Sequence, residues 1–149
     1  MKLDDIKVVA QRSNDARSCE GCAKCCEGWL QGSAHGHAFY KGRPCFFLNK
    51  TCTIYDVRPD EPCKSYKCSW LAEDIFPHWM KPSLSNIIIT RRHFNDIVYY
   101  EIIEAGSKLD AKVLSWLVHW SLNTDNNIIY QIEDGSNKIG SIEFLKAPI

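Results

Sequence analysis

The 149-residue sequence contains no apolar run near the roughly 18 residues that a membrane-spanning helix needs, so we expect no membrane span. The amino-terminal segment MKLDDIKVVAQRSNDARS lacks a secretory apolar core and carries early acidic residues, from which we expect no signal peptide and a cytoplasmic protein. Lys plus Arg number 18 and Asp plus Glu number 18, so the charge balance gives no indication of a nucleic-acid partner. No glycine-rich segment of the kind that cradles a nucleotide-like cofactor stands out.

Cysteine is absent from the whole segment that follows Cys68, whereas eight cysteines lie between Cys19 and Cys68. This asymmetry separates a cysteine-rich half of the chain from a cysteine-free half. The thiols fall into three groups, which are Cys19, Cys22, Cys25 and Cys26; Cys45 and Cys52; and Cys63 and Cys68. The first group places its thiols on one short loop, which suits convergence on a metal centre.

Three interpretations of the eight thiols are open. An even number of cysteines can form a disulfide framework, but a reducing cytosol does not keep structural disulfides, and the chain is larger than most disulfide-dependent domains. Free or redox-active thiols are a further alternative. The C-x2-C-x2-C spacing favours metal binding over both and predicts that all eight cysteines are metal ligands.

Cys25 and Cys26 are adjacent, and we expect their side chains to point in different directions. Neighbouring side chains alternate across an extended chain and diverge by about 100° around a helix. This geometry favours two nearby metal centres, or different metals of one larger cluster. The alternative is that Cys26 is a buried thiol with no ligand role.

The segment RPDEPCKSYKCSWL predicts a helix that begins near Asp60 as N-cap, has Pro62 in its first turn and continues through Leu71. In such a helix, Cys63 and Cys68 would lie about 140° apart around the axis and about 7.5 Å apart along it. One compact four-ligand site would hardly accept both thiols. Cys63 would lie close to the amino-terminal end of the helix, where the dipole favours a thiolate.

Both zinc and an iron–sulfur cluster accept four thiolates as ligands. Structural zinc sites usually combine two separated C-x2-C pairs, whereas ferredoxins use a C-x2-C-x2-C run followed by later ligands. The spacing therefore favours an iron–sulfur cluster, with zinc as the alternative. Basic side chains of the same region could offset the negative charge of either centre, and these are Lys24, Arg43, Lys50, Arg58, Lys64 and Lys67.

The segments CEGCAKCC, PCFFL and CTIYDVRPDEPCKSYKCSWL together resemble the YkgJ-like cysteine-cluster family, also called the C-x2-C-x2-CC family. The likeness covers roughly residues 19–71, about a third of the chain. The positions that agree are Cys19, Cys22, Cys25, Cys26, Cys45, Cys52, Ile54, Tyr55, Arg58, Pro59, Cys63, Cys68 and Trp70. The resemblance implies that the cysteines chelate zinc or iron. Because a lysine methylase carries a similar cluster, it also leaves methyl transfer as an alternative.

The sequence gives less indication of a metal-binding role for the histidines than for the cysteines. His35 and His37 form an H-x-H pair near the thiols, a pattern that can bind metal. Solvent-facing loop positions are the favoured interpretation, because the eight thiols already suffice for two sites. We assign no role to His78, His93 or His119, which have no partner at a ligand-like spacing.

Arg58 could donate hydrogen bonds to cluster sulfurs, which would tune a metal site. The favoured interpretation is structural, with Arg58 pairing to Asp56 or Asp60 ahead of the next helix. Trp29 and Trp70 are expected in the core, with shielding of a metal centre from water as the alternative.

The cysteine-free half predicts two hairpins around a helix. SNIIITRRHFNDIVYYEIIEAG predicts a β-hairpin around RHFND, and NIIYQIEDGSNKIGSIEFL predicts a second one that turns at EDGSNK. In the helix between them, Ser107 and Asp110 resemble a capping box. Its apolar face, which predicts a docked core helix with partner binding as the alternative, consists of Leu109, Val113, Trp116, Leu117 and Trp120.

The order β-β-α-β-β over residues 84–149 predicts an α+β fold. In this fold a cysteine-rich, metal-binding amino-terminal half packs on a small antiparallel sheet with one amphipathic helix. Residues 1–149 are expected to form one domain, with residues 19–71 as its metal-binding region and residues 3–16 as a short helix. Metal binding is expected to be part of folding.

The predicted function is a metal-binding protein that uses eight clustered cysteines to hold an iron–sulfur cluster or zinc ions, in one or more centres. Two alternatives are kept. One is an enzyme that uses the cluster for redox or methyl-transfer-type chemistry, and the other is a protein-interaction module stabilised by zinc. Metal ions are the predicted partners, and the sequence identifies neither a protein partner nor a substrate.

Overall fold

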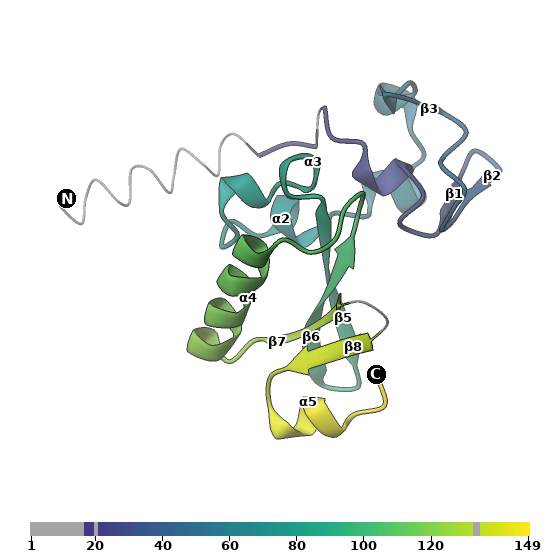
Figure 1. The fold of residues 1–149 in the computed structure, drawn as a ribbon. Helices are drawn as coiled ribbons and strands as arrows, with labels where there is room; N and C mark the ends of the chain where they lie inside the picture. Colours follow the sequence, from purple (N-terminus) through teal and green to yellow (C-terminus); the bar gives the residue numbers. More distant parts are fainter. Residues whose placement is uncertain (1–16, 20, 133–134) are drawn as a thin grey trace.

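The computed structural model describes residues 17–19, 21–132 and 135–149. The helix predicted over residues 3–16 lies outside the described residues. Figure 1 shows a loop-rich part at the upper right and a part in which one long helix lies beside a sheet. The predicted mixture of helices and strands is confirmed. Within the described ranges, no helix is both long and apolar enough to cross a membrane.

The cysteine-free half is built on a four-stranded sheet with the order β5-β6-β7-β8. The strands are β5 (Ile87–Phe94), β6 (Ile97–Glu104), β7 (Asn127–Ile132) and β8 (Gly135–Ile139). The β5–β6 hairpin is confirmed and turns at Asn95 and Asp96. However, β6 and β7 pair in parallel, so the prediction of an antiparallel sheet is wrong at this pair. The chain crosses the sheet through a helix before β7, and such a crossover returns the next strand in the same direction.

Helix α4 (Ala111–Thr124) is that crossover, and it lies along one face of the sheet (Figure 1). The carboxylate of Asp110 accepts a hydrogen bond of 2.7 Å from the Lys112 amide and caps the first turn. The predicted N-cap at Ser107 is therefore wrong. The N-cap is Asp110, three residues later, because its carboxylate accepts the capping hydrogen bond and residues 107–109 are not helical. The predicted apolar face is confirmed, since the residues packed in the main core include Leu109, Val113, Trp116, Leu117 and Trp120.

The second hairpin differs from its prediction. Strand β8 begins at Gly135, so part of the expected EDGSNK turn is strand, and residues 133–134 lie outside the described ranges. The SIEFL segment is not strand but contains helix α5 (Ile142–Lys146). The Ser141 hydroxyl accepts a hydrogen bond from the Phe144 amide at 3.2 Å, and Phe144 is fully buried against Tyr99. A serine cap and one buried aromatic therefore decide the conformation of this short apolar segment.

The main core lies between α4 and the sheet and receives side chains from the segment that follows the last cysteine. Trp70, Phe76 and Met80 are each at most 2% exposed in this core, which confirms the prediction for Trp70. Trp70 lies in α2 (Ser69–Ala72), Met80 in η4 (His78–Met80) and Phe76 in the loop between them, and the short helix α3 (Pro82–Ser85) follows before the sheet begins. The cysteine-rich half is thus attached to the sheet through the residues directly after Cys68.

We call residues 19–68 the cysteine lobe. Its described residues form short helical turns and two small hairpins. The elements are η1 (Lys24–Cys26), β1 (Gly32–Ala34), β2 (His37–Phe39), β3 (Leu48–Asn49), β4 (Thr51–Cys52), η2 (Tyr55–Val57) and η3 (Asp60–Lys64). The β1–β2 hairpin turns at His35 and Gly36, whose φ angles are 46° and 82°, so this segment is a hairpin rather than the predicted loop.

The helix predicted from Asp60 through Leu71 is not continuous. The helical turn η3 ends at Lys64, and α2 begins only at Ser69. Glu61 has φ −110° and ψ 126°, an extended conformation that the following proline favours. Cys68 is also extended, with φ −62° and ψ 156°. The predicted separation of Cys63 and Cys68 on one helix is therefore wrong, because they belong to two different elements.

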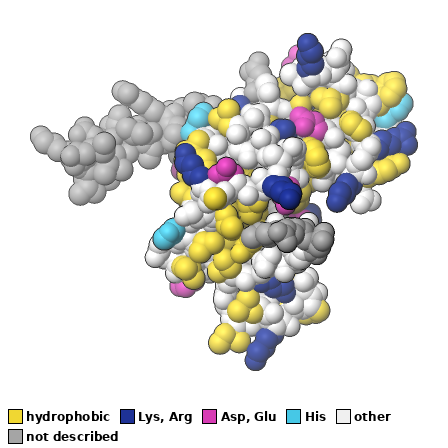
Figure 2. Space-filling model, in the orientation of Figure 1, with side chains coloured by type: hydrophobic (Ala, Val, Ile, Leu, Met, Phe, Trp, Pro, Cys, Tyr) yellow, Lys and Arg dark blue, Asp and Glu magenta, His cyan; other side chains and the backbone are white. Residues whose placement is uncertain are grey.

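The lobe and the sheet meet on the face opposite α4. The Tyr66 hydroxyl lies 2.9 Å from the Thr90 hydroxyl of β5, and burial raises the pKa of Tyr66 to about 12. A groove of about 440 Å³ separates Trp29 and Lys41 of the lobe from strands β6 and β7. Trp29 is only partly buried at this groove, so its predicted core position is wrong. Figure 2 shows apolar side chains gathered in the middle of the visible face, with acidic and basic side chains scattered around them.

Candidate metal centre

All eight cysteines of the lobe are free thiols. Helical turn η1 contains Cys25 and Cys26, β4 ends at Cys52, and η3 contains Cys63. Cys45 is buried, Cys25 is exposed and the other six are partly buried. The lobe therefore gathers thiols from three segments of the sequence without joining any two of them in a disulfide.

Three of these thiols share a small apolar core inside the lobe. Cys45 is buried with Ala34 and Phe39, and Cys26 and Cys63 pack against the same cluster. The Cys45 amide donates a hydrogen bond of 2.8 Å to the Cys26 carbonyl oxygen. This bond holds two segments together that are 19 residues apart in the printed sequence. One thiol from each of the three sequence groups thus reaches one apolar cluster.

Cys52 approaches the same cluster through the β3–β4 hairpin. It is paired across the hairpin with Leu48, which packs against the apolar cluster. The Leu48 amide also donates a hydrogen bond of 3.1 Å to the Cys45 carbonyl oxygen. The hairpin between Cys45 and Cys52 therefore folds back so that both cysteines lie beside the cluster.

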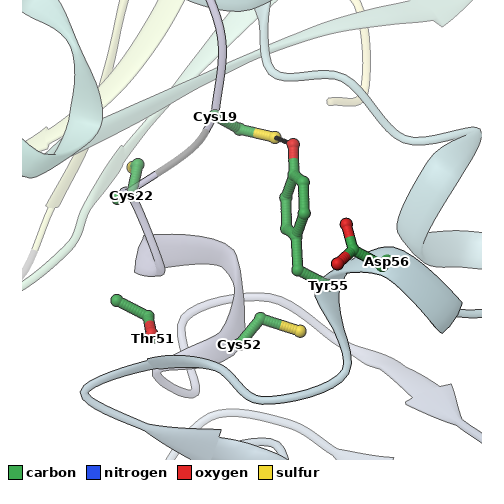
Figure 3. Close-up of a pocket in the computed structure, with 7 residues that line it drawn as sticks. Cys19, Cys22, Thr51, Cys52, Tyr55 and Asp56 are labelled. Carbon is green, nitrogen blue, oxygen red and sulfur yellow. Dashed lines mark hydrogen bonds between the residues drawn. The ribbon is translucent and has the colours of Figure 1, made fainter.

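A cavity of about 250 Å³ lies on the solvent side of the lobe. Figure 3 shows Cys19 and Cys22 on one wall of this cavity and Cys52 on the opposite wall. The side chain of Tyr55 extends along the cavity, and its hydroxyl oxygen lies 3.1 Å from the Cys19 sulfur (Figure 3). The remaining lining residues are Gly21, Thr51 and Asp56. The cavity thus brings together thiols from two sequence groups with one hydroxyl that can donate to a sulfur.

The adjacent thiols do not diverge as predicted, because the sulfur atoms of Cys25 and Cys26 lie 3.9 Å apart. A hydrogen bond between them explains the approach, since rotation about the side-chain torsions can bring the two sulfurs together. The hydrogen bond from the Cys26 thiol lowers the pKa of Cys25 to about 7 and raises the pKa of Cys26. Cys25 is therefore the thiol of this pair that ionises first, and it is also the exposed one.

Cys63 and Cys68 share Cys25 as a neighbour and otherwise have different thiol neighbours. Burial, with smaller contributions from the charges of Cys22 and Cys25, raises the pKa of Cys68 to about 11. Burial also raises the pKa of Cys63, with further contributions from the charges of Cys45, Cys25 and Cys52. Cys63 packs against the apolar cluster of the lobe, whereas Cys68 packs against the main core.

Arg58 contacts the neighbouring residue Tyr55 and carries a positive charge near two of the thiols. Its guanidinium lies 3.9 Å from the centroid of the Tyr55 ring and donates a hydrogen bond to the Tyr55 carbonyl oxygen. Its positive charge favours the thiolates of Cys25 and Cys63. The predicted pairing with Asp56 or Asp60 is wrong, because among the described residues neither carboxylate forms an ion pair with Arg58, and Asp60 instead lies 3.5 Å from Lys64.

Arg17 is a positioning residue that sequence reasoning missed. Its guanidinium donates hydrogen bonds to the carbonyl oxygens of Trp70 at 2.5 Å and Glu73 at 2.9 Å, and also to that of Phe76. It also interacts electrostatically with Cys68. These contacts hold the chain before Cys19 against the chain after Cys68. No local pattern could indicate them, because the partners lie 53 to 59 residues away.

The two histidines of the β1–β2 turn contact surface groups of the lobe. The His37 ring stacks on Phe46 with the centroids 4.1 Å apart, and a His35 ring nitrogen lies 3.0 Å from the Val57 carbonyl oxygen. Phe46 and Val57 are 68% and 69% exposed, so this is the outer surface of the lobe. The contacts favour the interpretation that these histidines are surface residues.

Among the described residues, no three His, Cys, Asp or Glu side chains already surround one point closely enough to hold a metal ion. No family model, curated protein or solved structure matches the chain. The fold and the site therefore define a class: an α+β protein whose amino-terminal lobe gathers eight free thiols beside a four-stranded sheet.

Proposed function

We propose that the protein binds metal through its eight cysteine thiols, which hold an iron–sulfur cluster or zinc. The observation that carries this proposal is the gathering of eight free thiols from three sequence segments in one lobe. Buried cysteines that only fill a core need no such concentration, and of the eight cysteines Cys68 alone packs against the main core. A reducing compartment such as the cytoplasm would keep these thiols available to a metal.

The dimensions of the lobe support this proposal. Thiolates bound to one tetrahedral ion at about 2.3 Å lie about 3.8 Å from each other. The sulfur atoms of Cys25 and Cys26 are 3.9 Å apart, so this pair is spaced as two ligands of one ion would be. Cys19 and Cys22 face Cys52 across a cavity of about 250 Å³. This volume is many times the roughly 15 Å³ that one water needs, so the space between these thiols is not filled by protein.

The surrounding residues suit an anionic centre. Tyr55 can donate a hydrogen bond to the Cys19 sulfur, and Arg58 places a positive charge near Cys25 and Cys63. Hydrogen bonds and charges of this kind orient thiolate ligands and tune the metal that they bind. An iron–sulfur cluster bound here would supply electron transfer, whereas zinc would supply structural stability.

A second candidate function is an enzyme that uses the cluster for redox or group-transfer chemistry. The observation that favours it is the solvent-facing cavity, which carries the Tyr55 hydroxyl and the Asp56 carboxylate beside the thiols. Catalytic metal sites keep an accessible position, whereas structural sites are closed by protein ligands. A small molecule that protects Cys19 and Cys22 from alkylation in the metal-loaded protein would support this function.

Anaerobic purification followed by iron, zinc and acid-labile sulfide analysis tests the main proposal. Stoichiometric iron and sulfide with broad visible absorption would support the iron–sulfur form, and a colourless protein with stoichiometric zinc would support the zinc form. The substitution Cys45→Ser should reduce the metal content, whereas the double substitution His35→Ala with His37→Ala should leave it unchanged. A folded protein that takes up neither metal during anaerobic reconstitution would contradict the proposal.

A further inference from the structure

We propose that Cys25 and Cys26 form a redox-sensitive pair, which hydrogen peroxide closes to a reversible disulfide that competes with metal for the same two sulfurs. The disulfide itself needs no metal, whereas the competition rests on the proposed function. Cys25 is the thiol that the oxidant reaches first, and Cys26 is the thiol that closes the bond. The pair therefore makes the metal occupancy of the lobe depend on oxidant.

The two sulfur atoms are already neighbours in the reduced chain. They lie 3.9 Å apart, and among the described residues no other two cysteine sulfurs form a contact of this kind. A disulfide holds its sulfurs at about 2.0 Å, so the two atoms must approach by roughly 2 Å. Both residues lie in η1, a helical turn of three residues, so the approach requires adjustment of one short turn rather than of a long element.

The two thiols differ in access to solvent. Cys25 is exposed, whereas Cys26 is partly buried and packs against the apolar cluster around Cys45. Two backbone hydrogen bonds hold Cys26 in place, because its amide donates to the Ala23 carbonyl oxygen at 2.9 Å and its carbonyl oxygen accepts from the Cys45 amide at 2.8 Å. Since oxidation of a thiol depends on its exposure, Cys25 is the attacking thiol and Cys26 the resolving one.

The oxidation takes place in two steps. The Cys25 sulfur attacks one oxygen of hydrogen peroxide, so a sulfur–oxygen bond forms, the oxygen–oxygen bond breaks, and the departing hydroxide takes the thiol proton and leaves as water. The Cys26 sulfur then attacks the Cys25 sulfur, so the disulfide forms, the sulfur–oxygen bond breaks, and a second water leaves with the Cys26 proton. The two thiols lose two electrons, which the peroxide gains.

The geometry of adjacent residues favours a disulfide that is readily reduced. Consecutive Cα atoms lie about 3.8 Å apart across a trans peptide bond, which is below the range of about 4.4–6.8 Å that most disulfides span. A disulfide between neighbours is therefore strained, and strained or exposed disulfides are the easily reduced ones. A dithiol reductant thus restores both thiols, and the bond is a reversible modification rather than a permanent cross-link.

Metal binding and the disulfide exclude each other because both use the same sulfurs. The reduced pair suits a metal, since its 3.9 Å separation is close to the roughly 3.8 Å between two thiolates on one tetrahedral ion. Once the sulfurs are bonded to each other, neither is available as a thiolate ligand. Bound metal should therefore protect the pair from peroxide, and the disulfide should reduce metal uptake.

The sequence allows this disulfide to be mapped in the wild-type chain. Trypsin cuts after Lys24 and Lys41, and the peptide of residues 25–41 contains Cys25 and Cys26 and no other cysteine. The metal-free folded chain is treated with one equivalent of hydrogen peroxide, the remaining thiols are alkylated, and the peptides are analysed by mass spectrometry. The expected result is an unalkylated peptide 25–41 that is lighter by two hydrogen atoms. Cross-linking of this peptide to another one, or earlier oxidation of other cysteines, would overturn the proposal.

Two matched variants test the roles of the neighbouring thiols. In Cys26→Ser, Cys25 has no adjacent thiol, so peroxide should add oxygen atoms to it instead of closing a disulfide. In Cys22→Ser, which removes the C-x2-C neighbour of Cys25, the disulfide within residues 25–41 should form as in the wild type. Loss of this disulfide from Cys22→Ser would contradict the assigned pair. Circular dichroism checks the fold of both variants, and the wild-type mapping decides if either one unfolds.

The competition with metal is tested on the full chain loaded with the metal that it retains on anaerobic purification. Loading should slow disulfide formation within residues 25–41 several-fold, and the peroxide-treated chain should take up less metal until dithiothreitol restores the thiols. Equal metal uptake before and after oxidation would overturn the competition. A chain that forms the disulfide but binds neither zinc nor iron would instead overturn the proposed function.

Discussion

The guanidinium group of Arg17 lies 4.9 Å from the centroid of the Trp70 ring and also donates a hydrogen bond to the Trp70 carbonyl oxygen. Trp70 belongs to the main core, whereas Arg17 lies two residues before the first cysteine. These contacts therefore connect the start of the cysteine lobe with the core that supports the sheet. They hold together the two ends of the lobe, which are far apart in the sequence.

Replacement of this residue, Arg17→Ala, is expected to lower the free energy of unfolding by about 1–3 kcal/mol, because several hydrogen bonds from a charged group are lost. Urea unfolding followed by tryptophan fluorescence measures the change. The matched control is Lys108→Ala, which removes an exposed cation and should change stability by less than about 0.5 kcal/mol. Equal stability of the two variants would contradict the role assigned to Arg17.

Gly28 lies where the first loop packs against the chain that leads to Cys45. Its φ angle is +96°, and a Cβ atom there would lie 3.2 Å from the Tyr40 carbonyl oxygen and 3.3 Å from backbone atoms of Arg43 and Pro44. Gly42 has a similar φ of +89° but no atom within 4 Å of the corresponding position. The two glycines thus share the same backbone strain for an added side chain and differ only in available space.

We expect Gly28→Ala to destabilise the cysteine lobe by about 1–3 kcal/mol more than Gly42→Ala, because packed backbone must move to accept the methyl group. Denaturant unfolding and the alkylation rate of the buried Cys45 thiol report the effect. Faster labelling of Cys45 in Gly28→Ala than in Gly42→Ala is the expected result. Identical labelling in both variants would show that the close approach at Gly28 does not hold the lobe together.

We expect the ionisation of Tyr100 to reduce the stability of the folded chain at alkaline pH. Its hydroxyl donates a hydrogen bond of 2.7 Å to Glu73, and burial raises the pKa of Tyr100 to about 12 from an ordinary value of about 10. Between these values the folded chain keeps a proton that the unfolded chain releases, so stability falls as the pH rises from about 10 to about 12. Below pH 10 this contribution is fully present.

The variant Tyr100→Phe lacks this ionisation and should lose less stability than the wild type over the same alkaline interval. Urea unfolding at several pH values measures both curves, and the comparison cancels the contributions of other titrating groups. Parallel curves for the two proteins would mean that Tyr100 ionises equally easily in the folded and unfolded chains.

Helix α4 offers a matched pair of leucines for testing how it packs on the sheet. Leu117 is fully buried in the main core, whereas Leu122 of the same helix is 66% exposed. Leu117→Ala should lower the free energy of unfolding by about 2–5 kcal/mol, because it removes buried apolar surface and leaves a cavity. Leu122→Ala should change it by less than about 0.5 kcal/mol, and thermal or urea unfolding of both variants checks the difference.

Sequence reasoning succeeded where a structure follows from a short repeating pattern. The apolar positions of α4 recur at helical spacing, and the β-branched runs around Asn95 and Asp96 form the predicted hairpin. It failed where a few atoms decide between two local conformations. Asp110 rather than Ser107 caps α4, and the serine-capped segment around Phe144 is helical where a strand was expected. The interruption of the predicted helix between Lys64 and Ser69 was not predicted either, because it depends on residues that adopt an extended conformation within a segment of helical pattern.

The sequence by itself determined that all cysteines belong to one half of the chain, and that the other half carries the strands and the amphipathic helix of the main core. Such properties follow from residue order and periodicity, which need no knowledge of distant contacts. Only the tertiary structure decided the neighbours of each thiol, the parallel pairing of β6 with β7 and the contact of Arg17 with Trp70. These depend on segments that are distant in the sequence, and packing and hydrogen bonding select one arrangement among many that the local patterns allow.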